Sequence, residues 1–307
     1  MNRKALNKLA ENARKPDALL STVAYLSENL SFLKTGEKVL ILFNRNGKDR
    51  VGKLFGDAVA QRGAEPIFWE EDCRWISLLR LAFSQRITTI IGPPLIVLGL
   101  SKLAKYRSVP LNVRNVVTAG YPCMDWMIDG IQNGFDCNTW GCFDPGGTTV
   151  ICGFSCGKSR GVHLRDSEYE IKILDADGIE QPEGVSGQIV IESKNLKNVQ
   201  YFHGHSGSVL REQCACGNPS PRLMDFDIMV EEENKDAEAL FQFLHSWTSI
   251  LDCDVKRGPY GIELELVIFP GEKLPKLPTC AKQVIRPWEP ETDKPFYYTP
   301  DMPEPLF

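Results

Sequence analysis

Three cysteines and one histidine are spaced so that together they could bind a metal ion. Cys156 and His163 lie in the segment FSCGKSRGVHL, and Cys214 and Cys216 lie further along the chain in EQCACG. Three thiolates with one imidazole form the closed tetrahedral ligand set that structural zinc favours. Gly217, directly after the second pair, allows a tight turn that points backbone N–H groups at sulfur. The sequence therefore predicts a structural zinc site formed by these four side chains.

Other interpretations of the cysteine and histidine residues stay open. The C-x-C spacing is tighter than the usual C-x-x-C of zinc sites, and the chain contains ten cysteines, so the four could be ordinary positions. His203 and His205, in YFHGH, could form a metal pair in which one of them replaces His163. A catalytic nucleophile is conceivable among four further cysteines, Cys123, Cys137, Cys142 and Cys152. No histidine is near these four in the sequence, and small buried apolar positions explain most such cysteines.

Two expected strands connect the two halves of the predicted zinc site. Residues 169–174 alternate apolar with polar and charged residues, as a half-buried strand does. Asp177-Gly178 is a turn signal, and the segment GVSGQIVIE after it predicts a second alternating strand.

The order of these features resembles one known family. The segments C-x6-H, EIKILDADG, GQIVIES, YFHGH and CACGNPSPR are similar, in the same order, to motifs of the phenylacetate–CoA ligase branch of the adenylate-forming (AMP-dependent, acyl-CoA synthetase) superfamily. The similarity extends over residues 35–285 and is concentrated in residues 135–222. It implies ATP- and Mg²⁺-dependent activation of an acyl or aryl acid and its transfer to CoA.

The resemblance assigns nucleotide-binding roles to four residues. Trp140 and Gly141 occupy the place of the family's aromatic-Gly pair, which stacks on adenine, and Asp144 occupies that of its magnesium-binding acid. Tyr201 matches the element that binds ribose, but His205 replaces the aspartate that accepts both ribose hydroxyls, and an imidazole cannot be a bidentate acceptor. Without the resemblance, Trp140 is interpreted as a core or pocket-wall residue.

Lys282 is the candidate catalytic residue that the resemblance implies. The segment AKQVIR around it is similar to the Gly-Lys-x-x-Arg pattern whose lysine stabilises the acyl-phosphate transition state. The structural alternative is a surface lysine before a proline-rich tail.

The phosphate-binding loop of the family has no counterpart among the segments of this sequence that resemble the family. In the family this Ser/Thr/Gly-rich loop precedes the region that matches residue 35, whereas residues 4–33 have helical spacing and no such loop. The segment 44–53, NRNGKDRVGK, lacks the G-K-[ST] ending of a P-loop. We therefore expect a degenerate relative, a binding or assembly subunit that does not adenylate alone. The alternatives are an acyl- or aryl-acid CoA ligase completed by a partner chain that carries the phosphate loop, and a small-molecule binding module without chemistry.

Strand and helix patterns alternate from residue 38 to residue 133, which predicts an α/β fold with a parallel, doubly wound sheet. A zinc-bearing antiparallel β segment and a small C-terminal α+β lid domain are expected to follow. The lid would contain a helix over 233–251, a strand over 261–269 and an extended proline-rich tail from Pro270. The predicted domains are a helical segment (1–34), the core with the zinc site (35–222) and the C-terminal domain (223–307).

Composition narrows the class of protein. The chain has 307 residues, 43% of them hydrophobic, which is enough for a sizeable core. A formal net charge of −5 gives no electrostatic reason to expect nucleic acid or an anionic membrane as a partner. The N-terminus carries charges throughout and no apolar signal core, and ten cysteines without a signal peptide favour reduced thiols. We therefore expect a cytoplasmic protein.

Overall fold

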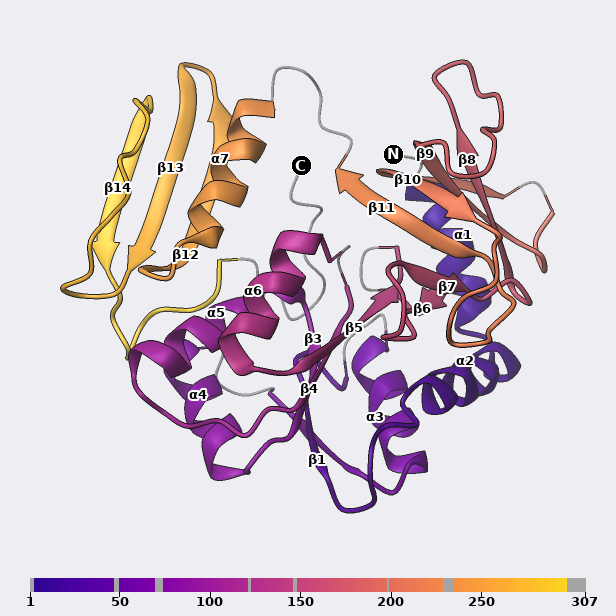
Figure 1. Ribbon diagram of the computed structural model, residues 1–307, viewed down its shortest axis with the longest axis horizontal. Helices are drawn as coiled ribbons and strands as arrows, with labels where there is room; N and C mark the ends of the chain where they lie inside the picture. Colours follow the sequence, from indigo (N-terminus) through magenta and orange to yellow (C-terminus); the bar gives the residue numbers. More distant parts are fainter. Residues whose placement is uncertain are drawn as a thin grey trace.

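Parallel strands with helices between them build the first half of the molecule (Figure 1). The computed structural model describes residues 3–46, 50–69, 74–120, 123–145, 148–197, 199–228 and 235–296. The elements of this half are β1 (Lys38–Ile41), α3 (Val51–Gln61), β2 (Glu65–Phe68), α4 (Trp75–Ser84), β3 (Thr89–Gly92), α5 (Pro94–Tyr106), β4 (Asn115–Thr118), α6 (Asp125–Phe135) and β5 (Asn138–Phe143). Strands β2-β1-β3-β4-β5 pair in parallel in this order, so the predicted doubly wound parallel sheet is confirmed. Strands β1, β3 and β4 are almost entirely buried, as expected for a sheet covered on both faces by helices.

The sheet continues beyond β5 with antiparallel strands. Its second half contains β6 (Gly153–Phe154), β7 (Val162–Leu164), β8 (Tyr169–Leu174), β9 (Gly187–Ser193), β10 (Gln200–Leu210) and β11 (Arg222–Ile228). They extend the order as β5-β6-β7-β11-β10-β9-β8, which makes one eleven-stranded sheet. The two strands predicted around Asp177-Gly178 are confirmed as β8 and β9. The predicted domain boundary at residue 222 coincides with the first residue of β11.

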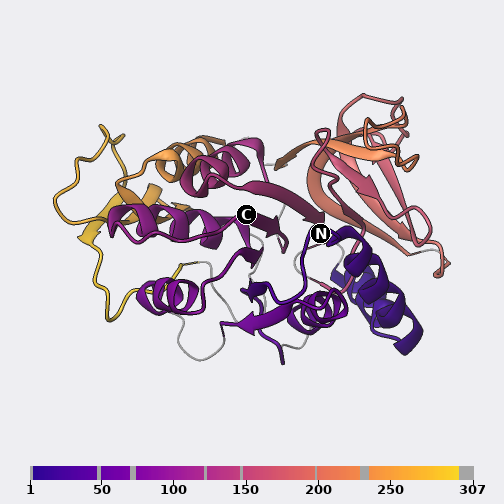
Figure 2. The same ribbon diagram turned by 60° about the horizontal axis from the view of Figure 1, so that its bottom comes forward.

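Two N-terminal helices pack against different halves of this sheet. Helix α1 (Arg3–Ala13) buries Leu9 among the antiparallel strands, and α2 (Pro16–Asn29) buries Leu26 against β1 and α3. Pro16, the expected helix break, is the first residue of α2. Figure 2 shows the indigo pair beside the antiparallel strands.

The C-terminal unit, defined here as residues 235–296, forms a separate three-stranded sheet. It contains α7 (Lys235–Ser246), β12 (Ile250–Gly258), β13 (Gly261–Ile268) and β14 (Lys282–Pro287), in the order β12-β13-β14. The helix predicted over 233–251 is wrong beyond Ser246, because Ile250 begins a strand that pairs with β13; residues 233–234 lie outside the described part. The predicted tail from Pro270 is extended over β14, but this strand also pairs in parallel with β13, which was not predicted.

The buried side chains of the C-terminal unit lie in two clusters, both of which include residues of the parallel half. Leu251, Phe269 and Trp288 lie in one buried cluster with residues of β3 and α5. A second cluster joins α7 and β12 to Met124 and Met127 of the α6 region. The part expected to be a lid is therefore packed directly onto the parallel half.

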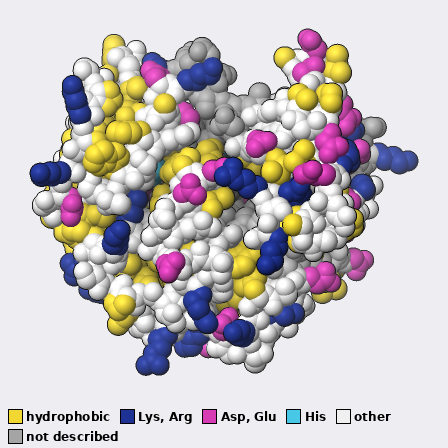
Figure 3. All heavy atoms as spheres, in the orientation of Figure 1, with side chains coloured by type: hydrophobic (Ala, Val, Ile, Leu, Met, Phe, Trp, Pro, Cys, Tyr) yellow, Lys and Arg dark blue, Asp and Glu magenta, His cyan; other side chains and the backbone are white. Residues whose placement is uncertain are grey.

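Within the described residues, no helix has both the length and the apolar character that a membrane span requires. On the face shown in Figure 3, basic and acidic side chains are interspersed over both halves of the molecule. This distribution agrees with the small net charge read from the sequence.

Candidate metal centre

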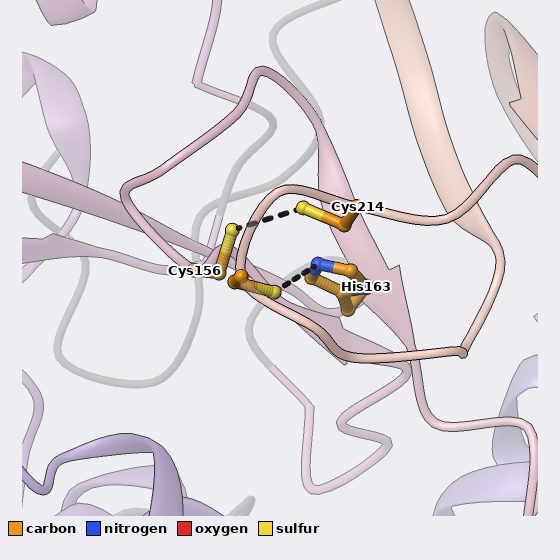
Figure 4. Close-up of side chains that lie close together, drawn as sticks. Cys156, His163 and Cys214 are labelled. Atoms are coloured by element: carbon orange, nitrogen blue, oxygen red, sulfur yellow. Dashed lines mark hydrogen bonds between the residues drawn. The ribbon is translucent and has the colours of Figure 1, made fainter.

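The four predicted zinc ligands lie together where the sheet changes from parallel to antiparallel (Figure 4). Cys156 is in the loop between β6 and β7, and His163 is the middle residue of β7. Cys214 and Cys216 are in the loop between β10 and β11. The two loops meet because β11 pairs with β7, with Arg222 opposite His163.

The distances fit a tetrahedral metal ion. All four ligand atoms lie within 4.8 Å of one another. The Sγ atoms of Cys156 and Cys214 are 3.7 Å apart, and Cys216 Sγ is 3.3 Å from Nε2 of His163. A zinc–sulfur bond of about 2.3 Å gives a tetrahedral S···S edge of about 3.8 Å, which the Sγ atoms of Cys156 and Cys214 already match. The three cysteines are free thiols, and the spacing is too long for a disulfide.

Groups behind the ligands already orient them for a cation. His163 Nδ1 is 3.1 Å from the carbonyl oxygen of Ser220, which holds the proton on Nδ1 and leaves Nε2 as the ligand atom. The backbone N–H of Cys216 and the hydroxyl of Ser159 lower the pKa of Cys214 to about 6. The N–H of Asn218 donates to Cys216 Sγ at 3.4 Å. These contacts favour the thiolate of Cys214, the form that binds a metal, whereas burial and the neighbouring thiols raise the pKa of Cys216.

Backbone conformation and a buried arginine hold the two loops. Gly217 has a φ of +85°, so the predicted tight turn behind the second thiol is present. Arg222 is buried, and its guanidinium donates to the carbonyl oxygen of Arg160 in the first loop and to Glu212 in the second. One side chain thus ties together the two segments that carry the ligands.

The sequence did not reveal these supporting groups. Ser159 lies inside the C-x6-H spacing, where a small polar residue carries no distinct signal. Ser220 acts through its carbonyl oxygen, which every residue type has. Only Arg222, a charged residue at the start of a strand directly after the C-x-C loop, offered a usable hint.

Trp140 and Gly141, the predicted adenine-stacking pair, lie on β5 in direct contact with the metal-site loop. Ser155 and Gly141 exchange two hydrogen bonds of 2.8 Å, one through the Ser155 hydroxyl and one through its backbone N–H. One face of Trp140 is covered by Phe32, with ring centroids 4.0 Å apart and planes at 10°. A side chain added at Gly157 would place its Cβ 3.0 Å from Nε1 of Trp140. The indole is therefore enclosed by the protein on one face and at its edge.

Asp144 and Tyr201 are also turned into the protein. Asp144 is 2% exposed, and its carboxylate accepts a 2.8 Å hydrogen bond from the N–H of Gly120. Tyr201 is buried in the core of the antiparallel half, and burial raises its pKa. Asp144 directly follows β5 and so lies close to Trp140 and Gly141 in the sequence, whereas the side chain of Tyr201 packs in the core of the antiparallel half.

Lys282, the predicted catalytic residue, is exposed at the start of β14. This strand is the outer member of the three-stranded sheet and lies away from β5 in both ribbon views. The structure does not bring Lys282 to Trp140 or Asp144.

The alternative interpretations receive no support from the described residues. His203 is 3% exposed on β10, beside His205 with ring centroids 4.6 Å apart, and the cluster of possible metal ligands contains His163 and neither of these. Burial, with the nearby His205, lowers the pKa of His203 well below its usual value, so it stays neutral. Burial raises the pKa of all four candidate nucleophilic cysteines, which keeps them protonated and unreactive: Cys123, Cys137, Cys142 and Cys152.

No family model and no curated protein matches the sequence. The fold, in contrast, matches solved acyl-CoA ligases. 2-Hydroxyisobutyryl-CoA ligase, solved in the postadenylation state with an acyl-AMP, has a TM-score of 0.65 at 10% identity over 81% of this chain and 58% of its own. The amide bond synthetase McbA from Marinactinospora thermotolerans has a TM-score of 0.53 at 12% identity, over 86% and 62%. A benzoate CoA ligase from Burkholderia xenovorans LB400 gives 0.52 at 11%, over 87% and 62%.

The chain thus has the α/β fold of adenylate-forming ligases and spans somewhat more than half of their length. At these identities the comparison concerns the fold, and the chemistry must be inferred from the side chains described above.

Proposed function

We propose that the chain is a degenerate relative of the phenylacetate–CoA ligases that serves as a binding or assembly subunit and does not adenylate an acid alone. The observation that carries this proposal is the stack of Phe32 on Trp140. The ring expected to hold adenine is already paired with an aromatic ring of the protein itself. Burial of two aromatic rings against each other stabilises the fold, and a nucleotide base would have to compete with it on that face.

The residue expected to hold magnesium supports the same proposal. Asp144 is shorter than the family's glutamate, is buried and accepts a hydrogen bond from Gly120. Mg²⁺ loses its water shell reluctantly and usually binds through exposed carboxylates and substrate phosphates. His205, at the position of the ribose-binding aspartate, leaves the two ribose hydroxyls poorly paired, which costs on the order of 1–3 kcal/mol of binding.

We further propose that Cys156, His163, Cys214 and Cys216 bind one structural zinc ion. Four protein ligands leave no position open for water or substrate, so the ion would not be catalytic. Zinc would join the β6–β7 loop to the β10–β11 loop and so hold the junction between the two halves of the sheet. A structural role of this kind suits a binding or assembly subunit, which needs a rigid surface and no catalytic metal.

The alternative is an acyl- or aryl-acid CoA ligase whose nucleotide site is completed by a partner chain. The fold match to solved CoA ligases, among them 2-hydroxyisobutyryl-CoA ligase, favours this candidate. It requires that the partner supply the phosphate loop and that Phe32 move away from Trp140.

Acid-dependent ATP–pyrophosphate exchange distinguishes the two proposals. The zinc-loaded chain is assayed with a panel of acyl and aryl acids, and a benzoate CoA ligase serves as the positive control. With Trp140 covered on one face by Phe32, Asp144 buried and His205 at the ribose position, we expect no exchange above background. Exchange by the purified chain contradicts the degenerate assignment, and exchange only after addition of a second polypeptide selects the partner-completed ligase.

A further inference from the structure

The contact between the C-terminal unit and α5 consists of buried, closely packed aromatic side chains, as in a protein core. Phe269 stacks on Tyr106 of α5 with ring centroids 4.2 Å apart and planes at 12°. Trp288 meets both rings edge-on, and the three are part of the cluster that contains the buried core of α5. A unit that swings free of its neighbour would expose all of this apolar surface to water.

Lys102 is a buried cation at the centre of this contact. It is 7% exposed on α5, and its Nζ donates to the carbonyl oxygens of His245, at 2.6 Å, and Ile250, at 3.0 Å. These carbonyls are at the end of α7 and the start of β12, so the ammonium of Lys102 bridges the two ends of the turn between these elements. Burial lowers the pKa of Lys102 to about 8.

The nearby groups leave Lys102 no other strong partner in the described part of the chain. Asp252 is buried within electrostatic reach, but its carboxylate accepts from the N–H groups of Cys253 and Phe296. Cys253 and His245 are buried, and burial keeps both side chains neutral. Lys102 is thus held mainly by the two carbonyl oxygens that the C-terminal unit presents.

Hydrogen bonds and an ion pair at the edge of the contact also hold the C-terminal unit on the parallel half. The N–H of Trp75, the first residue of α4, donates to the carbonyl oxygen of Asp293 at 3.0 Å. The guanidinium of Arg74 binds Glu291 at 2.9 Å, and the hydroxyl of Tyr106 donates to the carbonyl oxygen of Pro270 at 3.2 Å. The C-terminal unit is therefore attached on two helices of the parallel half.

We infer that Lys102 is a buried latch that fixes the C-terminal unit on α5, so that residues 235–296 form part of one rigid body and not a mobile lid. Movement of the unit would remove both acceptors from the ammonium and both donated bonds from the carbonyls. Movement of the unit would also expose the apolar surface of Tyr106, Phe269 and Trp288 to water, whereas a lid requires two positions of similar free energy.

Chemical labelling of lysine amines in the native protein tests this inference. Lys105 lies on the same helix and is exposed, so it is a matched internal control. An amine reagent followed by peptide mass spectrometry should modify Lys102 at least about 100-fold more slowly than Lys105, because access requires an opening of the contact. The ratio should persist with ATP, Mg²⁺, CoA and aryl acids present. Labelling of Lys102 within about tenfold of Lys105, with or without these ligands, would show that the unit opens and overturn the inference.

Two variants show whether the contact controls this protection. Tyr106→Ala removes the stack on Phe269 and the bond to Pro270, and should raise Lys102 labelling by at least about tenfold while circular dichroism shows a folded chain. Phe83→Ala, at an exposed aromatic residue of α4, should leave the rate unchanged. An unaltered rate in Tyr106→Ala would mean that the protection does not come from docking. None of these outcomes depends on whether the chain adenylates, which the exchange assay decides separately.

Discussion

At the scale of single residues, the metal centre combines four ligands with donors that prepare them. Ser220 fixes the tautomer of His163, and Ser159 with a backbone N–H favours the Cys214 thiolate. Loss of such outer contacts typically lowers metal affinity by about 10–100-fold. The candidate centre therefore combines a donor set and a spacing that suit zinc with a thiol, Cys214, whose pKa is lowered.

Removal of one ligand should release the ion and weaken the fold. Cys214→Ser should lower the zinc content from one per chain to near zero, measured by elemental analysis of protein purified without chelator. The free energy of unfolding should fall by about 4 kcal/mol, the value expected when a ligand near 1,000 times its dissociation constant is lost. Cys280→Ser, at a half-buried cysteine outside the centre, is the matched control. A full zinc content in Cys214→Ser would contradict the assignment.

Burial of Asp252 should make stability depend on pH. Burial raises the pKa of this carboxyl to about 7 from an ordinary value of 3.8, so the folded state holds a proton that the unfolded state has lost. The associated stability is present at low pH and is lost as the pH rises through 7. Between pH 5.5 and 7 the stability of the wild type should fall by about 2 kcal/mol relative to Asp252→Asn.

Denaturant unfolding of the two proteins at several pH values measures this difference, and subtraction removes the contribution of the metal centre. Asp177→Asn, at an exposed turn, controls for the loss of one carboxylate. A difference that is constant with pH, or that rises between pH 5.5 and 7, would contradict the assigned state of Asp252.

At the scale of elements, the metal-site loop and β5 form one unit. Ser155 brackets Gly141 through two hydrogen bonds, and Gly157 lies against the edge of Trp140. Cys156 lies between Ser155 and Gly157 in the sequence and would be bound to the ion. The position of Trp140 should therefore depend on the metal.

Fluorine NMR of 5-fluorotryptophan-labelled protein tests this dependence. Trp140→Phe assigns the Trp140 resonance, and a chelator then removes zinc. We expect the Trp140 signal to shift or broaden while those of Trp75 and Trp288, buried in the cluster of the parallel half, stay unchanged. An unmoved Trp140 signal after complete zinc removal would show that β5 and the metal centre are independent.

Local patterns were enough to predict the elements of the first half up to α6, whereas the strand β5 was not predicted. Residues 38–41 and 89–92 are short apolar runs, and each is followed by a helical pattern, so strand and helix were distinguishable. The strand β12 was missed because its apolar residues continue the helical spacing of α7. The strand β14 was missed because the segment before it is proline-rich. Its pairing with β13 is a tertiary contact that the local sequence does not indicate.

At the scale of the whole molecule, the sheet changes from parallel to antiparallel at β5–β6, and the candidate metal centre lies at that change. Sequence motifs predicted both halves and the four ligands between them. They did not predict the docking of the C-terminal unit, because Lys102, Tyr106 and their partners are far apart in the sequence and each looks ordinary in its own helix or strand. Nor did they predict that Phe32 would cover Trp140.

Calorimetric titration of the zinc-loaded chain with ATP, with and without Mg²⁺, tests the central claim most directly. With Trp140 stacked on Phe32, Asp144 bound to Gly120 and His205 in place of the ribose acceptor, we expect no saturable heat up to millimolar ATP. Phe32→Ala should not restore tight binding, because the other two positions still lack their groups. Magnesium-dependent, saturable binding of ATP by the wild type at micromolar concentrations would contradict the claim and identify the chain as a nucleotide-binding ligase component.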